Sequence, residues 1–191
     1  MIILRYFTIC VLSLFAVSCT SYAPRVGPSF TPGPNTVVVY GRLKFADNIT
    51  PRESAFSGYR MALQLSNEET KKLIYVRFSK SKPIACARIH PGHYKLTGFI
   101  ATDTSDVTVD GKLFGPEDKL DIRFAAEPNT AIYLGDFVGY VKYYKYGDLT
   151  TIEAGLTHTT NNFSETTANF HEAYPNLAAV PVRSGFDKAG K

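Results

Sequence analysis

The sequence predicts a mainly β protein, an antiparallel β-sandwich followed by one C-terminal α-helix. Short segments alternate apolar and polar residues along most of the chain, as strands with one buried face do. Turn-forming residues, among them 14 Gly and 11 Pro, separate these segments. A helical period occurs only near the C-terminus. Since 45% of the residues are hydrophobic and 20% are charged, a disordered chain and a polytopic membrane protein are excluded.

The first 18 residues are expected to be a signal peptide. They contain one charge, Arg5, followed by an uncharged run from Tyr6 to Val17. A membrane-spanning helix needs roughly 20 apolar residues, so this run is short for a permanent anchor. A charged start, a short apolar centre and small residues at the end are typical of a secretory signal. The alternative is a buried N-terminal helix.

Cys19 ends the motif Ala16-Val17-Ser18-Cys19, which resembles the lipobox of bacterial lipoproteins. The resemblance implies cleavage before Cys19 and attachment of acyl chains such as palmitate, which would anchor the protein. By resemblance to the sorting of enteric lipoproteins, Thr20 instead of Asp after Cys19 favours the outer membrane of the cell envelope over the inner one. The alternative is ordinary cleavage after Ser21-Tyr22-Ala23, although Pro24 would hinder it.

Residues 20–35 contain four prolines and two glycines and are expected to form a flexible tether after the acylated cysteine. The sandwich and helix are expected over residues 36–178, and residues 179–191 are expected to be a tail. Cys10 leaves with the signal peptide and Cys19 would be acylated, so Cys86 has no intrachain disulfide partner. Its apolar surroundings favour a buried thiol over a reactive one.

The strands follow from apolar alternation and from the turns between them. His90-Pro91-Gly92 predicts a turn, with Gly92 free to adopt positive φ. Asp110-Gly111 predicts a hairpin, and Gly147-Asp148 predicts a turn between two long strands. The expected strands cover residues 36–45, 59–65, 72–80, 83–89, 93–101, 106–114, 120–125, 131–146 and 149–158.

A helix is expected over residues 163–174, because apolar residues recur there at helical spacing. Asn162 or Ser164 suits the N-cap, Glu165 suits the positive end of the helix, and Pro175 ends it. The stripe that should pack on the sandwich consists of Phe163, Thr167, Phe170 and Tyr174.

Two segments carry a family resemblance, Pro91-Gly92-His93-Tyr94-Lys95-Leu96 and Pro128-Asn129-Thr130-Ala131-Ile132-Tyr133-Leu134-Gly135-Asp136-Phe137. With the lipobox and the Tyr174-Pro175 pair, they resemble small bacterial envelope lipoproteins of unknown function. The resemblance implies an Ig-like or transthyretin-like sandwich. It brings no catalytic residues. Where the family has Gly in the second turn, this chain has Asn129, which tolerates positive φ.

Two surfaces are candidates for binding. A basic patch of Lys71, Lys72, Arg77, Lys80 and Lys82 suits anionic lipid headgroups or an acidic partner. The alternative is an edge strand whose lysines prevent sheet-to-sheet association. The densest aromatic segment suits protein or sugar contacts, or packing within a long hairpin. It comprises Tyr140, Lys142, Tyr143, Tyr144, Lys145 and Tyr146.

The sequence contains no motif for catalysis, a nucleotide or a metal. His90 and His93 flank a turn but lack a third ligand for zinc. Asp103, Asp106 and Asp110 lack the spacing of a calcium loop and are interpreted as solvated carboxylates. We therefore expect no catalytic residue, no metal and no cofactor. The net charge of +4 is too small to indicate nucleic-acid binding.

Together these observations predict a lipid-anchored envelope protein that acts as a non-enzymatic binding or assembly module. Its expected partners are the membrane, reached through the lipid anchor, and another envelope protein. Two alternatives stay open: an envelope hydrolase whose site is assembled from distant residues, and a carbohydrate or lipid carrier.

Overall fold

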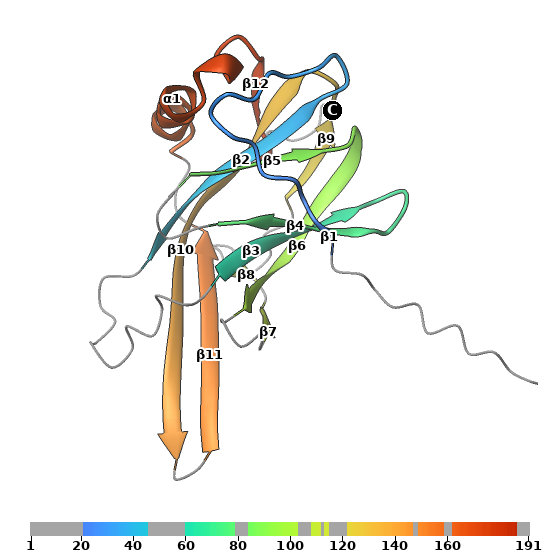
Figure 1. Ribbon diagram of the computed structural model, residues 1–191. Coiled ribbons are helices and arrows are strands. Elements are labelled where there is room, and N and C mark those ends of the chain that lie inside the picture. The colour runs from blue at the N-terminus through green and yellow to red at the C-terminus, as the bar shows by residue number, and fades with distance from the viewer. Residues whose placement is uncertain are drawn as a thin grey trace, which may run out of the picture.

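The predicted β-sandwich with one C-terminal helix is confirmed (Figure 1). The computed structural model describes residues 21–45, 60–78, 84–102, 108–111, 113–114, 122–146, 149–158 and 162–186. These residues form two sheets, each with a continuous path of five strands and a sixth strand paired beside it. Among the described residues, no helix is both long and apolar enough to span a bilayer.

The first sheet has the strand order β1-β4-β3-β6-β7, and β9 pairs with β6. Apart from the parallel pair β1–β4, its neighbouring strands are antiparallel. The bounds are β1 Ser21–Tyr22, β3 Arg60–Asn67, β4 Leu73–Arg77, β6 Gly92–Thr102, β7 Thr108–Gly111 and β9 Arg123–Ala126.

The second sheet has the order β5-β2-β10-β11-β8, and β12 pairs with β10. It is mixed and not antiparallel throughout as expected, because β2 and β12 run parallel to β10 while β11 runs antiparallel to it. The bounds are β2 Val37–Phe45, β5 Ile84–Ile89, β8 Leu113–Phe114, β10 Thr130–Tyr146, β11 Leu149–His158 and β12 Val182–Ser184.

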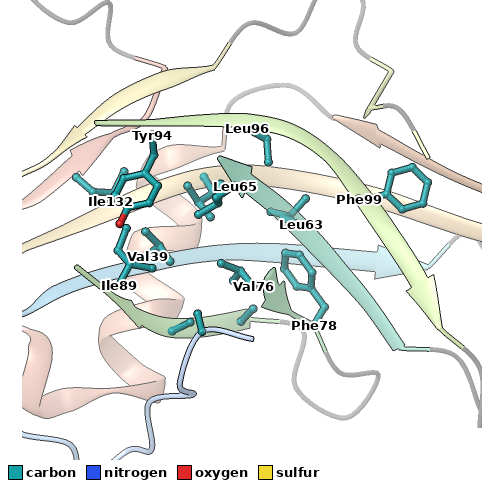
Figure 2. Packing of buried hydrophobic residues seen from close by; sticks show 14 of the residues in the cluster. Val39, Leu63, Leu65, Val76, Phe78, Ile89, Tyr94, Leu96, Phe99 and Ile132 are labelled. Carbon is teal, nitrogen blue, oxygen red and sulfur yellow. The ribbon is translucent and has the colours of Figure 1, made fainter. Parts of the chain in front are cut away.

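The main core fills the space between the two sheets (Figure 2). Leu63 and Phe99 come from the first sheet, Val39 and Leu134 come from the second, and all four are fully buried. These residues lie inside because strand side chains alternate between the two faces of a sheet. The apolar alternation at Met61, Leu63 and Leu65 therefore marks the inner face of β3 correctly.

A second apolar cluster covers the outer face of β2 and β10 with the C-terminal helix. Helix α1 spans Phe163–Ala173, and the 3₁₀-helix η2 spans Pro175–Leu177. The ring of Phe170 stacks on Tyr40 with centroids 4.1 Å apart, and Tyr174 is also buried. The predicted apolar stripe does dock on the sandwich, and Thr166 beside it is fully buried as well. Strands β2 and β10 of the second sheet are therefore covered on both faces, by the first sheet on one side and by α1 on the other.

The expected tether is attached to the sandwich over residues 21–27, which we call the N-terminal strap. Strand β1 pairs with β4 of the first sheet, and the amide of Ala23 donates to the carbonyl of Tyr75 at 2.9 Å. The amide of Val26 donates to the carbonyl of Cys86 in the second sheet at 3.0 Å. The strap thus bridges the edges of both sheets. Proline lacks an N–H but keeps its carbonyl, and that of Pro24 accepts from the amide of Arg88.

The C-terminal segment also differs from the expected tail, because residues through Phe186 join the domain. Val182–Ser184 form β12 against β10, and the amide of Gly185 donates to the carbonyl of Tyr133 at 2.8 Å. Val180 is buried against the helix cluster. These short apolar segments find partners that are distant in sequence, so no local pattern marks them.

The predicted hairpin at Asp110-Gly111 is wrong. Both residues lie within β7, where they pair with Ile100 and Phe99 of β6. The next strand, β8, pairs with β11 in the other sheet. The chain therefore crosses between sheets after this dipeptide instead of folding back beside β7.

Candidate functional site

The basic patch is brought partly together at the edge of the first sheet. Lys71 and Lys72 are exposed immediately before β4. Arg77, at the end of β4, places its guanidinium 3.9 Å from the centre of the Tyr22 ring. Strand β1 pairs with β4 at Ile74 and Tyr75 and is the outermost strand of this sheet, so β4 has a neighbouring strand at these two positions. Lys80 and Lys82, like Cys19, lie outside the described residues.

Open cavities flank the N-terminal strap. One, of about 190 Å³, is lined by two arginines, Arg25 and Arg77, and by residues that include Cys86 and Tyr174. Another, of about 660 Å³, is lined by Tyr22, Arg88 and His90 among others. Residues of the strap line both cavities.

Cys86 lies beside the first cavity as a buried thiol, as the sequence predicts. Burial strongly raises the pKa of this thiol. A thiol held protonated is a poor nucleophile, so Cys86 suits packing and not catalysis.

The aromatic segment lies on the long hairpin β10–β11, as predicted. These strands pair from Phe137↔His158 to Tyr146↔Leu149. Strand β2 follows β10 only as far as the pair Gly139↔Phe45. Beyond that point, within the described part of the chain, β10 pairs with β11 alone. The hairpin formed by these two strands extends away from the sandwich (Figure 1). The candidate residues Tyr140, Lys142, Tyr143, Tyr144, Lys145 and Tyr146 all belong to this portion of β10.

Of these side chains the structure describes that of Tyr140, whose hydroxyl donates to Glu153 Oε1 on β11 at 2.8 Å. This contact is an example of cross-strand pairing within the hairpin, one of the two predicted interpretations. The other side chains of the segment lie outside the described set.

A buried polar network, which sequence reasoning missed, joins the second sheet to helix α1. Its centre is Asp136 on β10, which forms an ion pair with Arg42 on β2. Arg42 Nε donates to Asp136 Oδ2 at 2.8 Å, and its Nη2 donates to the same oxygen. Arg42 and Asp136 are 6% and 3% exposed, so the pair is largely removed from water.

The helix supplies further donors to the same carboxylate. Thr166 Oγ1 donates to Asp136 at 2.9 Å, and Asn162 Nδ2 donates at 3.2 Å. Asn162 stands at the N-cap position but makes no side-chain cap bond, because its amide points to Asp136. Glu165, in the first turn, accepts from Arg42, and this hydrogen bond lowers the pKa of the Glu165 carboxyl.

This network is suited to holding the helix in place. Burial, together with the neighbouring carboxylate of Asp136, raises the pKa of the Tyr133 phenol, so the phenol stays protonated and donates to Asp136 Oδ1 at 2.8 Å. Both carboxylate oxygens thus accept from protein donors, and the buried charge is compensated. The signal in the sequence was a lone carboxylate within the apolar run 131–138.

The histidines are distributed over separate environments. His93 is exposed, and its Nδ1 lies 2.9 Å from Glu69 Oε1. His90, three residues earlier, is also exposed. Asp110 lies in β7, while Asp103 and Asp106 fall outside the described residues. Within the described part of the chain, no three His, Cys, Asp or Glu residues are grouped to hold a metal ion.

Comparison with known proteins identifies no family for this chain. No protein-family model and no curated protein matches this chain. Among solved structures, the chain is weakly similar to the dioxygenase domain of a dioxygenase–carbohydrate-binding protein fusion from the cellulolytic bacterium Streptomyces sp. SirexAA-E. The similarity has 13% identity and a TM-score of 0.25, and covers 73% of this chain and 88% of that one.

Proposed function

We propose that this chain is a lipid-anchored protein of the bacterial outer membrane and acts as a non-enzymatic binding or assembly module. The anchor is Cys19 of the lipobox, which precedes the N-terminal strap. The segments that resemble small envelope lipoproteins of unknown function agree with this proposal.

The observation that carries the binding role is the projecting hairpin. Residues 140–146 of β10 pair with β11 after the pairing with β2 has ended. Four tyrosines and two lysines occupy this stretch. Tyrosine provides a large contact area at a low entropic cost and is enriched in protein interfaces. A membrane anchor would add to any such contact by raising the local concentration of the module near its partner.

The polar chemistry of the described residues agrees better with binding than with catalysis. The buried carboxylate of Asp136 accepts hydrogen bonds from Arg42, Tyr133 and the helix. The thiol of Cys86 is buried, and this burial raises its pKa and so favours the protonated form. Each of these groups is accounted for by packing or by helix docking.

The test is site-specific photo-crosslinking in native membranes. A photoreactive phenylalanine analogue replaces Tyr144 on the hairpin in the full-length protein. The matched control carries it at Glu172, which is exposed on α1 at the other end of the molecule (Figure 1). We expect one dominant envelope protein to be linked through position 144 and not through position 172. Equal labelling at both positions, or none, would contradict the hairpin as the binding surface and favour the carrier or hydrolase alternatives.

The anchor is tested separately with Cys19→Ser. Because the anchor precedes the folded domain, this variant should fold normally but leave the membrane fraction. Mass spectrometry of the wild-type N-terminal peptide should show the added acyl mass on Cys19. A variant that still sediments fully with membranes would overturn the lipobox interpretation.

A further inference from the structure

The docked strap limits how far the folded domain can lie from an acylated Cys19. Cys19 is two residues before Ser21, the first residue of β1. Two residues of fully extended chain span about 7 Å at most. With the strap bound to the sandwich, a lipid on Cys19 would sit beside the edge of the first sheet and not at the end of a long tether.

The register of β1 shows which residues lie at that edge. Strand β1 runs parallel to β4, with Ser21 beside Ile74 and Tyr22 beside Tyr75. The beginning of β1 therefore lies beside the beginning of β4. Lys71 and Lys72 are the two residues immediately before β4, and both are exposed.

The charge of this edge is suited to an anionic surface. The turn before β4 also carries Glu68 and Glu69, but each already contacts a cationic or titratable partner: Glu68 accepts from Arg123 at 3.0 Å, and Glu69 lies 2.9 Å from His93. Within the described part of the chain, neither Lys71 nor Lys72 forms an ion pair. Lysines beside a bilayer are attracted to anionic lipid headgroups.

Tyr22 adds an aromatic group to the same edge. At 37% exposure it is the single exposed large hydrophobic side chain among the described residues. Arg77 covers one side of its ring at 3.9 Å. Tyrosine rings flanked by cationic side chains are typical of the membrane–water interface, where the ring contacts the acyl boundary and the charges meet the headgroups.

We propose that this domain lies directly on an anionic lipid surface through the β1 edge, with Tyr22 at the interface and Lys71 and Lys72 against the headgroups. The inference rests on the proposed acylation of Cys19 and adds an orientation to it. In this orientation the strap acts as a clamp that joins the lipid anchor to both sheets.

The absence of Trp from the chain allows a direct test. Tyr22→Trp places one fluorophore at the proposed interface, and Ala179→Trp places one at an exposed position beyond η2. Each full-length lipoprotein is purified from membranes and reconstituted into phosphatidylglycerol-containing vesicles with brominated acyl chains. We expect bromine to quench the Tyr22→Trp variant and shift its emission to the blue, and to leave the Ala179→Trp variant unchanged.

Vesicle flotation separates this inference from the proposed anchoring. Protein that floats with vesicles, but whose two variants are quenched equally, overturns the orientation and leaves the anchor intact. Protein that fails to float contradicts the acylation, and the orientation falls with it.

Two substitutions with the same change of charge, each made in the Tyr22→Trp variant, test the role of the headgroups. Lys72→Glu should lower the ratio of docked to undocked protein about 10-fold or more on anionic vesicles. Lys44→Glu, the same change at an exposed position near the far end of β2, should leave the ratio unchanged. An equal effect of both substitutions would overturn the assignment of the headgroup contact to this edge.

Discussion

The hydroxyl of Tyr133 donates a hydrogen bond to Asp136, three residues later on the same strand, at 2.8 Å. Residues three apart on a regular strand point to opposite faces of the sheet. Here the pairing with β2 shifts between Tyr133↔Tyr40 and Asp136↔Arg42. An advance of three residues along β10 therefore corresponds to an advance of two residues along β2. This bulge places both side chains on the outer face, where the carboxylate meets helix α1.

The ion pair of Arg42 and Asp136 is expected to be important for stability. Asp136→Asn removes the charge of the buried carboxylate. The buried guanidinium of Arg42 then keeps only its ion pair with Glu165, whose side chain is largely exposed. Leaving a buried charge uncompensated is costly, so we expect the free energy of unfolding to fall by about 3 kcal/mol. Urea unfolding followed by circular dichroism measures this change.

Glu165→Gln is the matched control, because it neutralises the exposed partner of the same guanidinium. The Glu165 side chain is 62% exposed, so solvent screens its pair with Arg42, and its neutralisation should lower the free energy of unfolding far less than Asp136→Asn does. Equal losses for the two variants would contradict the central role of Asp136.

Gly135 is expected to tolerate no side chain. Its φ of +115° lies in the region that favours glycine, and an added Cβ would lie 2.8 Å from His158 Nε2 and from Phe186. We expect Gly135→Ala to lower the free energy of unfolding by at least about 1–3 kcal/mol through backbone strain alone. Gly27→Ala, where the added Cβ meets nothing within 4 Å, should be close to neutral by the same assay.

Phe170 is expected to be the main apolar contact of the helix. It is fully buried and stacks on Tyr40. Phe170→Ala should cost about 3–5 kcal/mol through lost burial and the cavity left behind. Glu172→Ala, at an exposed position of the same helix, should stay within about 0.5 kcal/mol. An unchanged melting temperature for Phe170→Ala would show that helix docking does not support the fold.

His158 is expected to make stability sensitive to acid. Burial lowers the pKa of its imidazole, although the nearby carboxylate of Asp136 opposes the shift. The unfolded chain, with a pKa of about 6.5, then binds a proton more readily than the folded chain. His158 therefore favours the folded state above that pH, and this contribution is lost as the pH falls through the lowered pKa of the folded state.

Denaturant unfolding between pH 7.5 and pH 5 measures this effect. A single group contributes at most about 1.4 kcal/mol per pH unit. His158→Gln should make the decline toward pH 5 shallower than in the wild type. Identical slopes for the two proteins would show that another group controls the response.

Local patterns in the sequence determined most of the strands and the helix. Alternating residues such as Met61, Leu63 and Leu65 predict an inner face, and the structure buries all three. The turn residues behave as their backbone preferences require, since Asn129 adopts φ 57° and Gly92 adopts φ 144°. These properties follow from residues close together in the chain, so periodicity and turn chemistry are sufficient to predict them.

The tertiary structure alone decided where residues 21–27 and residues 180–186 dock and what surrounds Asp136. Residues 21–27 look like a Pro-rich tether in isolation, yet their amides and carbonyls pair with β4 and β5. Asp136 acquires its partners from Arg42, over ninety positions away, and from the helix. Hydrogen bonds between segments distant in the chain produce no periodic pattern in the sequence, because the packing of the whole sandwich determines which groups meet.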